Sequence, residues 1–135
     1  MAVILIVDDD PTVRLIATEM LRASDHAIVE ASDGLEALRL LGAMAIDLVV
    51  LDMLMPNCDG VEVLMSIRRT QPSVKVLAIS SGGRVGPGDY LNTARVLGAD
   101  AILVKPLRLD SFRSMVDAMV SGRAASVAQS ERFLA

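Results

Sequence analysis

Residues 48–51 form a run of four apolar residues that ends directly on an aspartate, Asp52. Two of the four are β-branched, and an unbroken apolar run of this length is typical of a strand buried on both faces of a parallel sheet. Pro56 and Gly60, with polar residues between them, then end the strand and open a loop. We therefore expect Asp52 at the carboxyl end of a central strand, where open α/β sheets bind their ligands.

The rest of the chain alternates strand-like and helix-like segments around this run. Strands are expected at residues 2–7, 27–30, 74–79 and 101–104, and helices at 11–22, 34–41, 61–70, 89–97 and 109–120. This alternation predicts a doubly wound α/β fold, with a five-stranded parallel sheet, right-handed crossovers and helices on both faces. The chain has no internal repeat and its length fits one domain, which we expect over residues 1–122. Residues 123–135 are rich in Ala and Ser, so we expect them to form a flexible tail.

Side chains that favour helix ends support these boundaries. Asp10 is a good N-cap before Pro11, which suits the first helical position, and Asp33 with Glu36 has the spacing of a capping box. Three helices are expected to stop at a glycine, namely at Gly42, Gly98 and Gly122. The inner face of the first helix is expected to consist of Val13, Ile16, Ala17, Met20 and Leu21.

Composition and charge narrow the classes of function. The 135 residues are 53% hydrophobic but only 2% aromatic, so the core must be aliphatic, and the chain is long enough to need no disulfide or structural metal. A net charge of −4 argues against non-specific nucleic-acid binding as the main role. Cys58 is the single cysteine and fits a reducing compartment. Because residues 2–7 meet three aspartates and have no basic leader, we interpret them as a strand rather than a signal peptide or membrane span, and expect a cytoplasmic protein.

Polar residues lie at the ends of four of the expected strands. Asp8 and Asp9 follow the first strand, and Asp52 ends the third. Ser80 follows the fourth strand and Lys105 follows the fifth. Because the carboxyl ends of parallel strands share one edge of the sheet, we expect all five side chains at that edge.

Charge then indicates what this edge could bind. Three carboxylates about 5 Å apart repel one another by roughly 3 kcal/mol per pair at an effective dielectric constant of about 20. A single lysine cannot offset three such repulsions, so a divalent cation is the expected occupant, and hard oxygen ligands favour Mg²⁺ or Mn²⁺. A carboxylate beside a cation and a lysine suits phosphoryl transfer, in which the carboxylate attacks phosphorus.

Taken together, these motifs resemble the receiver domain of two-component response regulators. The resemblance rests on Asp8-Asp9, on Asp52 with the Met-Pro pair at 55–56 and Gly60 behind it, on Ser80, and on Lys105-Pro106, and it extends from about residue 3 to residue 120. It implies the strand order 2-1-3-4-5, which the chemotaxis receivers share with the flavodoxin-like branch of doubly wound folds.

The resemblance also implies a role for each residue. Asp52 would be the phospho-acceptor, and Asp8, Asp9, Asp52 and the backbone carbonyl of Leu54 would hold Mg²⁺. The hydroxyl of Ser80 would bond the phosphoryl group, and Lys105 would be the lysine that contacts it. The donor would be a histidine kinase or a histidine phosphotransfer protein, and the chain would be no enzyme beyond its own phosphorylation and dephosphorylation.

Signal output is expected through the face formed by the fourth helix, the fifth strand and the fifth helix. The expected partner is a downstream protein rather than nucleic acid or a membrane. A homodimer is also compatible with the resemblance. The family commonly has an aromatic residue three positions before the lysine, where this chain has Ile102. Residues 82–88 contain four glycines, so we expect this loop, with Tyr90 beyond it, to carry the switch together with Ser80.

Two other functions fit parts of the sequence. Residues 8–12 match the D-x-D-x-T pattern of haloacid-dehalogenase-like phosphatases, with Asp8 as nucleophile. That family needs a further acidic pair after another strand, whereas Asp110 and Asp117 lie on the last expected helix and Asp10 has the features of a helix cap. The second alternative is a receiver-like scaffold that binds partners without being phosphorylated. Since no second domain is expected, the chain resembles a single-domain regulator or a receiver taken from a longer protein.

Overall fold

The computed structural model describes residues 1–55, 60–81 and 87–122, without the side chains of residues 87–91. Within these ranges the chain forms one parallel five-stranded sheet with the order β2-β1-β3-β4-β5. The strands are β1 (Val3–Val7), β2 (Ala27–Ala31), β3 (Leu48–Asp52), β4 (Lys75–Ser81) and β5 (Ala101–Lys105). The helices are α1 (Pro11–Met20), α2 (Gly34–Ala43), α3 (Gly60–Thr70), α4 (Pro87–Val96) and α5 (Leu109–Ser121). The predicted doubly wound fold and strand order are confirmed.

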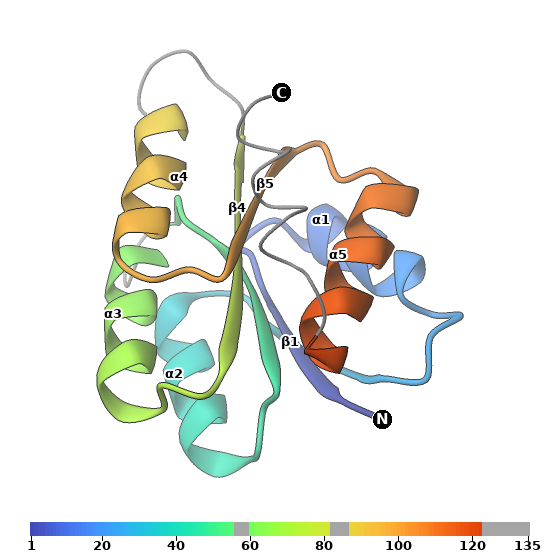
Figure 1. Cartoon of the computed structure of the whole chain (residues 1–135), viewed down its shortest axis with the longest axis horizontal. Helices are drawn as coiled ribbons and strands as arrows, with labels where there is room; N and C mark the ends of the chain where they lie inside the picture. Colours follow the sequence, from blue (N-terminus) through green and yellow to red (C-terminus); the bar gives the residue numbers. More distant parts are fainter. Residues whose placement is uncertain (56–59, 82–86, 123–135) are drawn as a thin grey trace.

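Helices cover both faces of the sheet. Figure 1 shows α1 and α5 on one face and α2, α3 and α4 on the other. Each face carries its own hydrophobic core, because side chains alternate between the faces along each strand. Leu5, Val49 and Ile102 belong to the core beneath α2, α3 and α4, whereas Ile4 and Phe112 belong to the core beneath α1 and α5. All five residues of β3 are buried, as the apolar run predicted.

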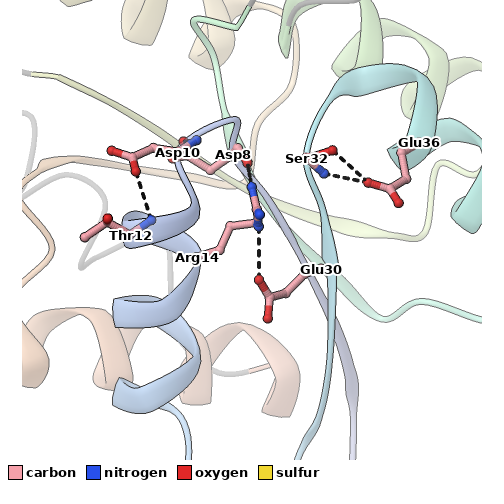
Figure 2. A network of polar contacts seen from close by, with 7 residues as sticks. All are labelled: Asp8, Asp10, Thr12, Arg14, Glu30, Ser32 and Glu36. Atoms are coloured by element: carbon pink, nitrogen blue, oxygen red, sulfur yellow. Dashed lines mark hydrogen bonds and ion pairs between the residues drawn. The ribbon is translucent and has the colours of Figure 1, made fainter.

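The predicted N-caps are confirmed. Asp10 Oδ1 accepts the backbone N–H of Thr12 at 2.9 Å at the start of α1, and Asp33 Oδ1 accepts that of Glu36 at 2.8 Å at the start of α2. Glu36 in turn accepts the backbone N–H of Ser32 at 2.7 Å (Figure 2). In a capping box the glutamate would accept the N–H of the N-cap itself, Asp33, so this bond reaches one residue further toward the N-terminus.

Two of the three predicted glycine stops are confirmed. Gly98 and Gly122 have φ values of +104° and +74°, a left-handed conformation that glycine adopts with little strain. The third is wrong, because α2 continues through Gly42 to Ala43 and ends at Met44, whose extended backbone closes the helix. Gly42 has no positive φ, and a glycine ends a helix in this way only when the chain turns left-handed there.

The expected inner face of α1 is only partly correct. Ala17 and Leu21 are buried, but Ile16 is 42% exposed and α1 ends at Met20 rather than near residue 22. Ile16 lines a surface hollow of about 340 Å³ with Val13, Ser81, Lys105, Pro106 and Leu107. The periodicity of α1 identified an apolar face wider than the part that reaches the sheet.

Several other boundaries also differ from the expectation. β4 extends through Ser81, so Ser80 lies inside the strand, and α4 runs from Pro87 to Val96 rather than over the expected residues 89–97. Residues 82–86 of the predicted switch loop, Cys58 and the expected tail at 123–135 lie outside the described residues. Within the described ranges, no helix combines the length and apolar composition that crossing a membrane requires.

Arg68, in the last turn of α3, ties together two connections at the amino edge of the sheet. Its guanidinium donates to the carbonyls of Gly98 and Val74, both at 2.8 Å, and to Asp100 Oδ2 at 2.6 Å. The same Asp100 oxygen accepts the backbone N–H of Val76 at 2.8 Å. One partly buried guanidinium therefore supplies hydrogen bonds to acceptors in both the turn after α3 and the turn after α4.

We predict that Arg68→Met lowers the free energy of unfolding by about 2 kcal/mol, because hydrogen bonds from a charged donor are lost and their acceptors stay partly buried. Urea denaturation followed by circular dichroism measures this. Arg69→Met is the matched control, since Arg69 is the neighbouring exposed arginine on the same helix. Equal losses in the two variants would contradict the role assigned to Arg68.

Candidate functional site

The carboxyl ends of four strands bring the predicted polar residues to one edge of the sheet. In the strand register Val7 pairs with Leu51, and Asp52 pairs with Ile79. Asp8 and Asp9 therefore leave β1 beside the end of β3. On the other side of β3, Ser81 pairs with Lys105, which places the end of β5 at the same edge.

Three carboxylates converge there. Asp8, Asp9 and Asp52 each contribute one oxygen to a group in which all oxygens lie within 4.8 Å of one another. The side chains of Asp8 and Asp52 are buried, whereas Asp9 is exposed. The three acids are therefore close enough for the mutual repulsion expected from the sequence. The group is open to solvent on the side of Asp9.

Lys105 is the cation that faces the carboxylates. Its Nζ lies 2.8 Å from Asp8 Oδ2 and 3.5 Å from Asp52 Oδ2, and its side chain is only 18% exposed. The contact with Asp8 is an ion pair rather than a well-directed hydrogen bond, so this buried oxygen keeps acceptor capacity. Burial acts to lower the pKa of Lys105, but the Asp8 and Asp52 carboxylates outweigh it and raise that pKa.

Asp52 is the most perturbed acid of the group. Burial, reinforced by the negative charge of Asp8, raises its pKa from 3.8 to about 6, although Lys105 acts in the opposite direction. The backbone N–H of Leu54 donates to Asp52 Oδ1 at 3.2 Å, which also favours the ionised form. Lys105 thus neutralises the site incompletely.

The hydroxyl of Ser80 is buried and has no hydrogen-bond partner among the described residues. A buried hydroxyl in this state is uncommon, because an unmade hydrogen bond costs free energy. Ser80 precedes the β4 residue that pairs with Lys105 and follows the one that pairs with Asp52. The edge therefore holds an unused donor next to an acidic cluster.

Gly60 explains how α3 can begin so close to the site. A Cβ at this position would lie 2.5 Å from both the carbonyl oxygen of Asp52 and the Cα of Met53. Any larger residue would push the end of β3 aside. The glycine expected behind the proline is thus required by the close approach of two backbones.

Comparison with known proteins identifies the family. Residues 4–117 match the response regulator receiver domain. The chain belongs to this family. It is accordingly a receiver domain of two-component signalling, which is a signalling domain rather than a classical enzyme.

Individual relatives agree with this assignment. The receiver is 37% identical over 108 residues to the chemotaxis protein CheY of Listeria monocytogenes, covering 79% of this chain and 88% of the relative. It is 31% identical over 113 residues to the sporulation initiation phosphotransferase F of Bacillus subtilis, covering 84% and 89%. It is 33% identical over 115 residues to the transcription factor SKN7 of Chaetomium thermophilum, covering 84% of this chain but only 15% of that protein.

Solved structures show the same fold. The receiver domain of NtrX from Brucella abortus superimposes with a TM-score of 0.80 at 27% identity, covering 87% of this chain and 98% of that chain. The superposition therefore covers most of this chain and nearly all of the NtrX receiver.

The residues expected to switch the receiver are only partly placed. Ile102 is 4% exposed and lies in the core beneath α2, α3 and α4, so it forms part of the packing rather than of the surface. Tyr90 lies in α4, but its side chain is outside the described residues. The Leu54 side chain is 47% exposed beside the acidic cluster.

Sequence reasoning missed Arg14. Its Nη1 donates to the backbone carbonyl of Asp8 at 2.7 Å, and its Nε bonds Glu30 at 3.0 Å. The only signal in the sequence is a basic residue one turn into the helix that follows an acidic strand end. That signal does not specify a contact with the carbonyl of Asp8.

The raised pKa of Asp52 predicts a pH-dependent stability. Since the folded-state pKa is about 6 and the unfolded value is 3.8, the contribution of Asp52 to stability is fully present below 3.8 and is lost as pH rises through 6. Without Mg²⁺, Asp52→Asn should therefore raise Tm at pH 7.5 by about 4 °C, and by much less at pH 4.5. Thermal unfolding followed by circular dichroism measures both values.

Asp25→Asn serves as the control, because Asp25 is an exposed aspartate far from the cluster in sequence. A gain in Tm that is equal at the two pH values, or equal in the two variants, would show that ionisation of Asp52 does not destabilise the fold.

Proposed function

We propose that this receiver accepts a phosphoryl group on Asp52 from the phosphohistidine of a histidine kinase or a histidine phosphotransfer protein. The observation that carries the proposal is the pairing of Asp52 with two neighbouring carboxylates within 4.8 Å and a lysine at 3.5 Å. In the transfer an Asp52 carboxylate oxygen forms a bond to phosphorus, the P–N bond breaks, and the donor imidazole leaves.

The acidic cluster fits a divalent cation, Mg²⁺ or Mn²⁺. Its donors are hard carboxylate oxygens, Asp8 Oδ2 keeps acceptor capacity, and Lys105 alone leaves the pKa of Asp52 raised. Asp9, Asp52 and the backbone carbonyl of Leu54 would hold the ion. Asp8 would contribute less directly, since its Oδ1 already accepts the Asp10 N–H at 2.9 Å. When bound, the cation supplies charge neutralisation for the carboxylates and the incoming phosphoryl oxygens.

The protein's own groups would then bind and read the phosphoryl group. Lys105 would exchange part of its pairing with Asp8 and Asp52 for the new anion, and the Ser80 hydroxyl would donate to one of its oxygens. Phosphorylation adds up to about two negative charges, so these contacts can draw the end of β4 toward Asp52. In the switch we propose, the residues after β4 and the start of α4 follow this movement.

The output surface would be the face of α4, β5 and α5. Val96 is 72% exposed and Val104 is 48% exposed on this face, so it presents apolar area to a downstream protein or to a second copy of the chain. Because Ile102 is buried and has no ring, its reorientation cannot serve as the reporter, and the signal would leave through α4. The proposed compartment is the cytoplasm, where the donor kinases present their phosphohistidine.

The phosphatase alternative is disfavoured by the geometry of Asp10. The second aspartate of a D-x-D-x-T motif must act on the substrate, but Asp10 here caps α1 by accepting the Thr12 N–H. Asp110 lies in the first turn of α5, and Asp117 follows two turns later on the same helix. Neither joins the acidic group of Asp8, Asp9 and Asp52.

Incubation with Mg²⁺ and acetyl phosphate, followed by intact-mass analysis, tests the proposal. We expect one added phosphoryl group in the wild type and in Asp25→Asn, no adduct in Asp52→Asn, and strongly reduced labelling when Mg²⁺ is chelated. An adduct that persists in Asp52→Asn would move the acceptor elsewhere. Absence of any adduct would favour the scaffold alternative, and repeated turnover of a phosphate ester would favour the phosphatase.

A further inference from the structure

The peptide unit that joins Asp8 to Asp9 is held by a side chain from outside the acidic cluster. Arg14, one turn into α1, donates from Nη1 to the Asp8 carbonyl at 2.7 Å and from Nε to Glu30 Oε1 at 3.0 Å. Figure 2 shows this guanidinium between the end of β1 and the edge strand β2. The Arg14 side chain is only 18% exposed, whereas Glu30 is 45% exposed.

Asp8 is fixed at each of its polar atoms. Its N–H donates to the Ala31 carbonyl at 3.2 Å, and its Oδ1 accepts the Asp10 N–H at 2.9 Å. Its Oδ2 pairs with Lys105 at 2.8 Å, which leaves the carbonyl for Arg14. Four polar atoms of Asp8 thus each contact a partner. Of these four, the carbonyl oxygen is the one in the peptide unit that Asp8 shares with Asp9.

Asp9 lacks such anchors. It is exposed, and no described residue gives its carboxylate a hydrogen bond or an ion pair. The direction of its side chain is thus set mainly by the backbone at its own Cα. Because a peptide unit is planar, holding the Asp8 carbonyl also fixes the plane that contains the Asp9 nitrogen and Cα.

We propose that Arg14 is a positioning residue for the cation site, and that it acts by orienting the Asp8–Asp9 peptide so that the Asp9 carboxylate meets Asp52. Glu30 holds Arg14 in the rotamer that reaches the Asp8 carbonyl. This inference rests on the proposed function, in which Asp9 is a metal ligand. It extends that function to a pair of residues on α1 and β2 that do not contact the ion.

The sign of the effect separates positioning from simple electrostatics. Arg14 is a cation close to a cation site, so removal of its charge alone would strengthen Mg²⁺ binding. Loss of a positioning contact has the opposite result, and groups that orient metal ligands typically change metal affinity by about 10-fold or more. Weaker binding in a variant without the positive charge therefore runs against the electrostatic effect, as lost positioning predicts.

Calorimetric titration with Mg²⁺ measures the difference. We expect Asp9→Ala to abolish measurable binding and Arg14→Met to raise Kd by about tenfold. Arg14→Lys should lie between, because one ammonium cannot reproduce the two-sided contact of the guanidinium. Arg22→Met is the matched control, since Arg22 is a 72% exposed arginine just beyond the same helix, and its Kd should equal that of the wild type. Unchanged or tighter binding in Arg14→Met would overturn the proposal.

A double-mutant cycle tests the part played by Glu30. Glu30→Ala removes an exposed carboxylate and should leave the fold intact, but it should weaken Mg²⁺ binding in the wild-type background. If Glu30 acts by holding Arg14, the substitution has no further effect in Arg14→Met. An effect of equal size in both backgrounds would mean that Glu30 acts through its charge, which would contradict the proposed pairing.

A metal-free measurement keeps this inference separate from the proposed function. If the wild type binds no Mg²⁺, the cation site of the proposed function fails. The positioning contact is then still tested by the NMR carbonyl-carbon resonance of Asp8, which should move in Arg14→Met and stay in place in Arg22→Met. An Asp8 resonance that is the same in both variants would show that Arg14 does not hold this peptide.

Discussion

The crowding of three carboxylates around a single lysine is the interaction on which the rest of this structure depends. Asp8, Asp9 and Asp52 bring three oxygens within 4.8 Å, and Lys105 reaches only two of the three residues. Burial disfavours the charged form of Asp52 and the negative charge of Asp8 adds to this, so the pKa of Asp52 rises to about 6. Such a site favours the binding of a cation. A bound cation would stabilise the ionised form of Asp52, which is the nucleophile that the proposed function needs.

The fold holds these acids together against their mutual repulsion. β3 is buried along its whole length, which fixes the position of Asp52 at the carboxyl edge of the sheet. Gly60 allows α3 to begin against the Asp52 carbonyl. Beyond the end of the neighbouring strand β1, Arg14 of α1 holds the Asp8 carbonyl. The acids are therefore positioned from both sides by groups outside the cluster, an arrangement that is usual for metal and phosphoryl sites.

Much of this arrangement could be predicted from the sequence, because it depends on local patterns. The run before Asp52 predicted a central strand, and parallel topology then placed all the strand-end residues at one edge. Features that depend on three-dimensional neighbours could not be predicted in this way. Gly42 lacks the left-handed conformation that would end α2, and Ile16 is exposed because α1 reaches the sheet through a narrower face than its periodicity suggested. The contact of Arg14 joins groups whose proximity follows only from the path of α1.

Lys105 leaves the acidic cluster undercompensated, and we propose that a divalent cation completes it. The most direct test is a pH titration of the Asp52 side-chain carboxyl by ¹³C NMR, with the resonance assigned by its loss in Asp52→Asn. We expect a midpoint of about 6 without Mg²⁺ and a midpoint lower by about one pH unit or more at saturating Mg²⁺. A midpoint near the ordinary aspartate value of 3.8 that does not respond to Mg²⁺ would contradict this.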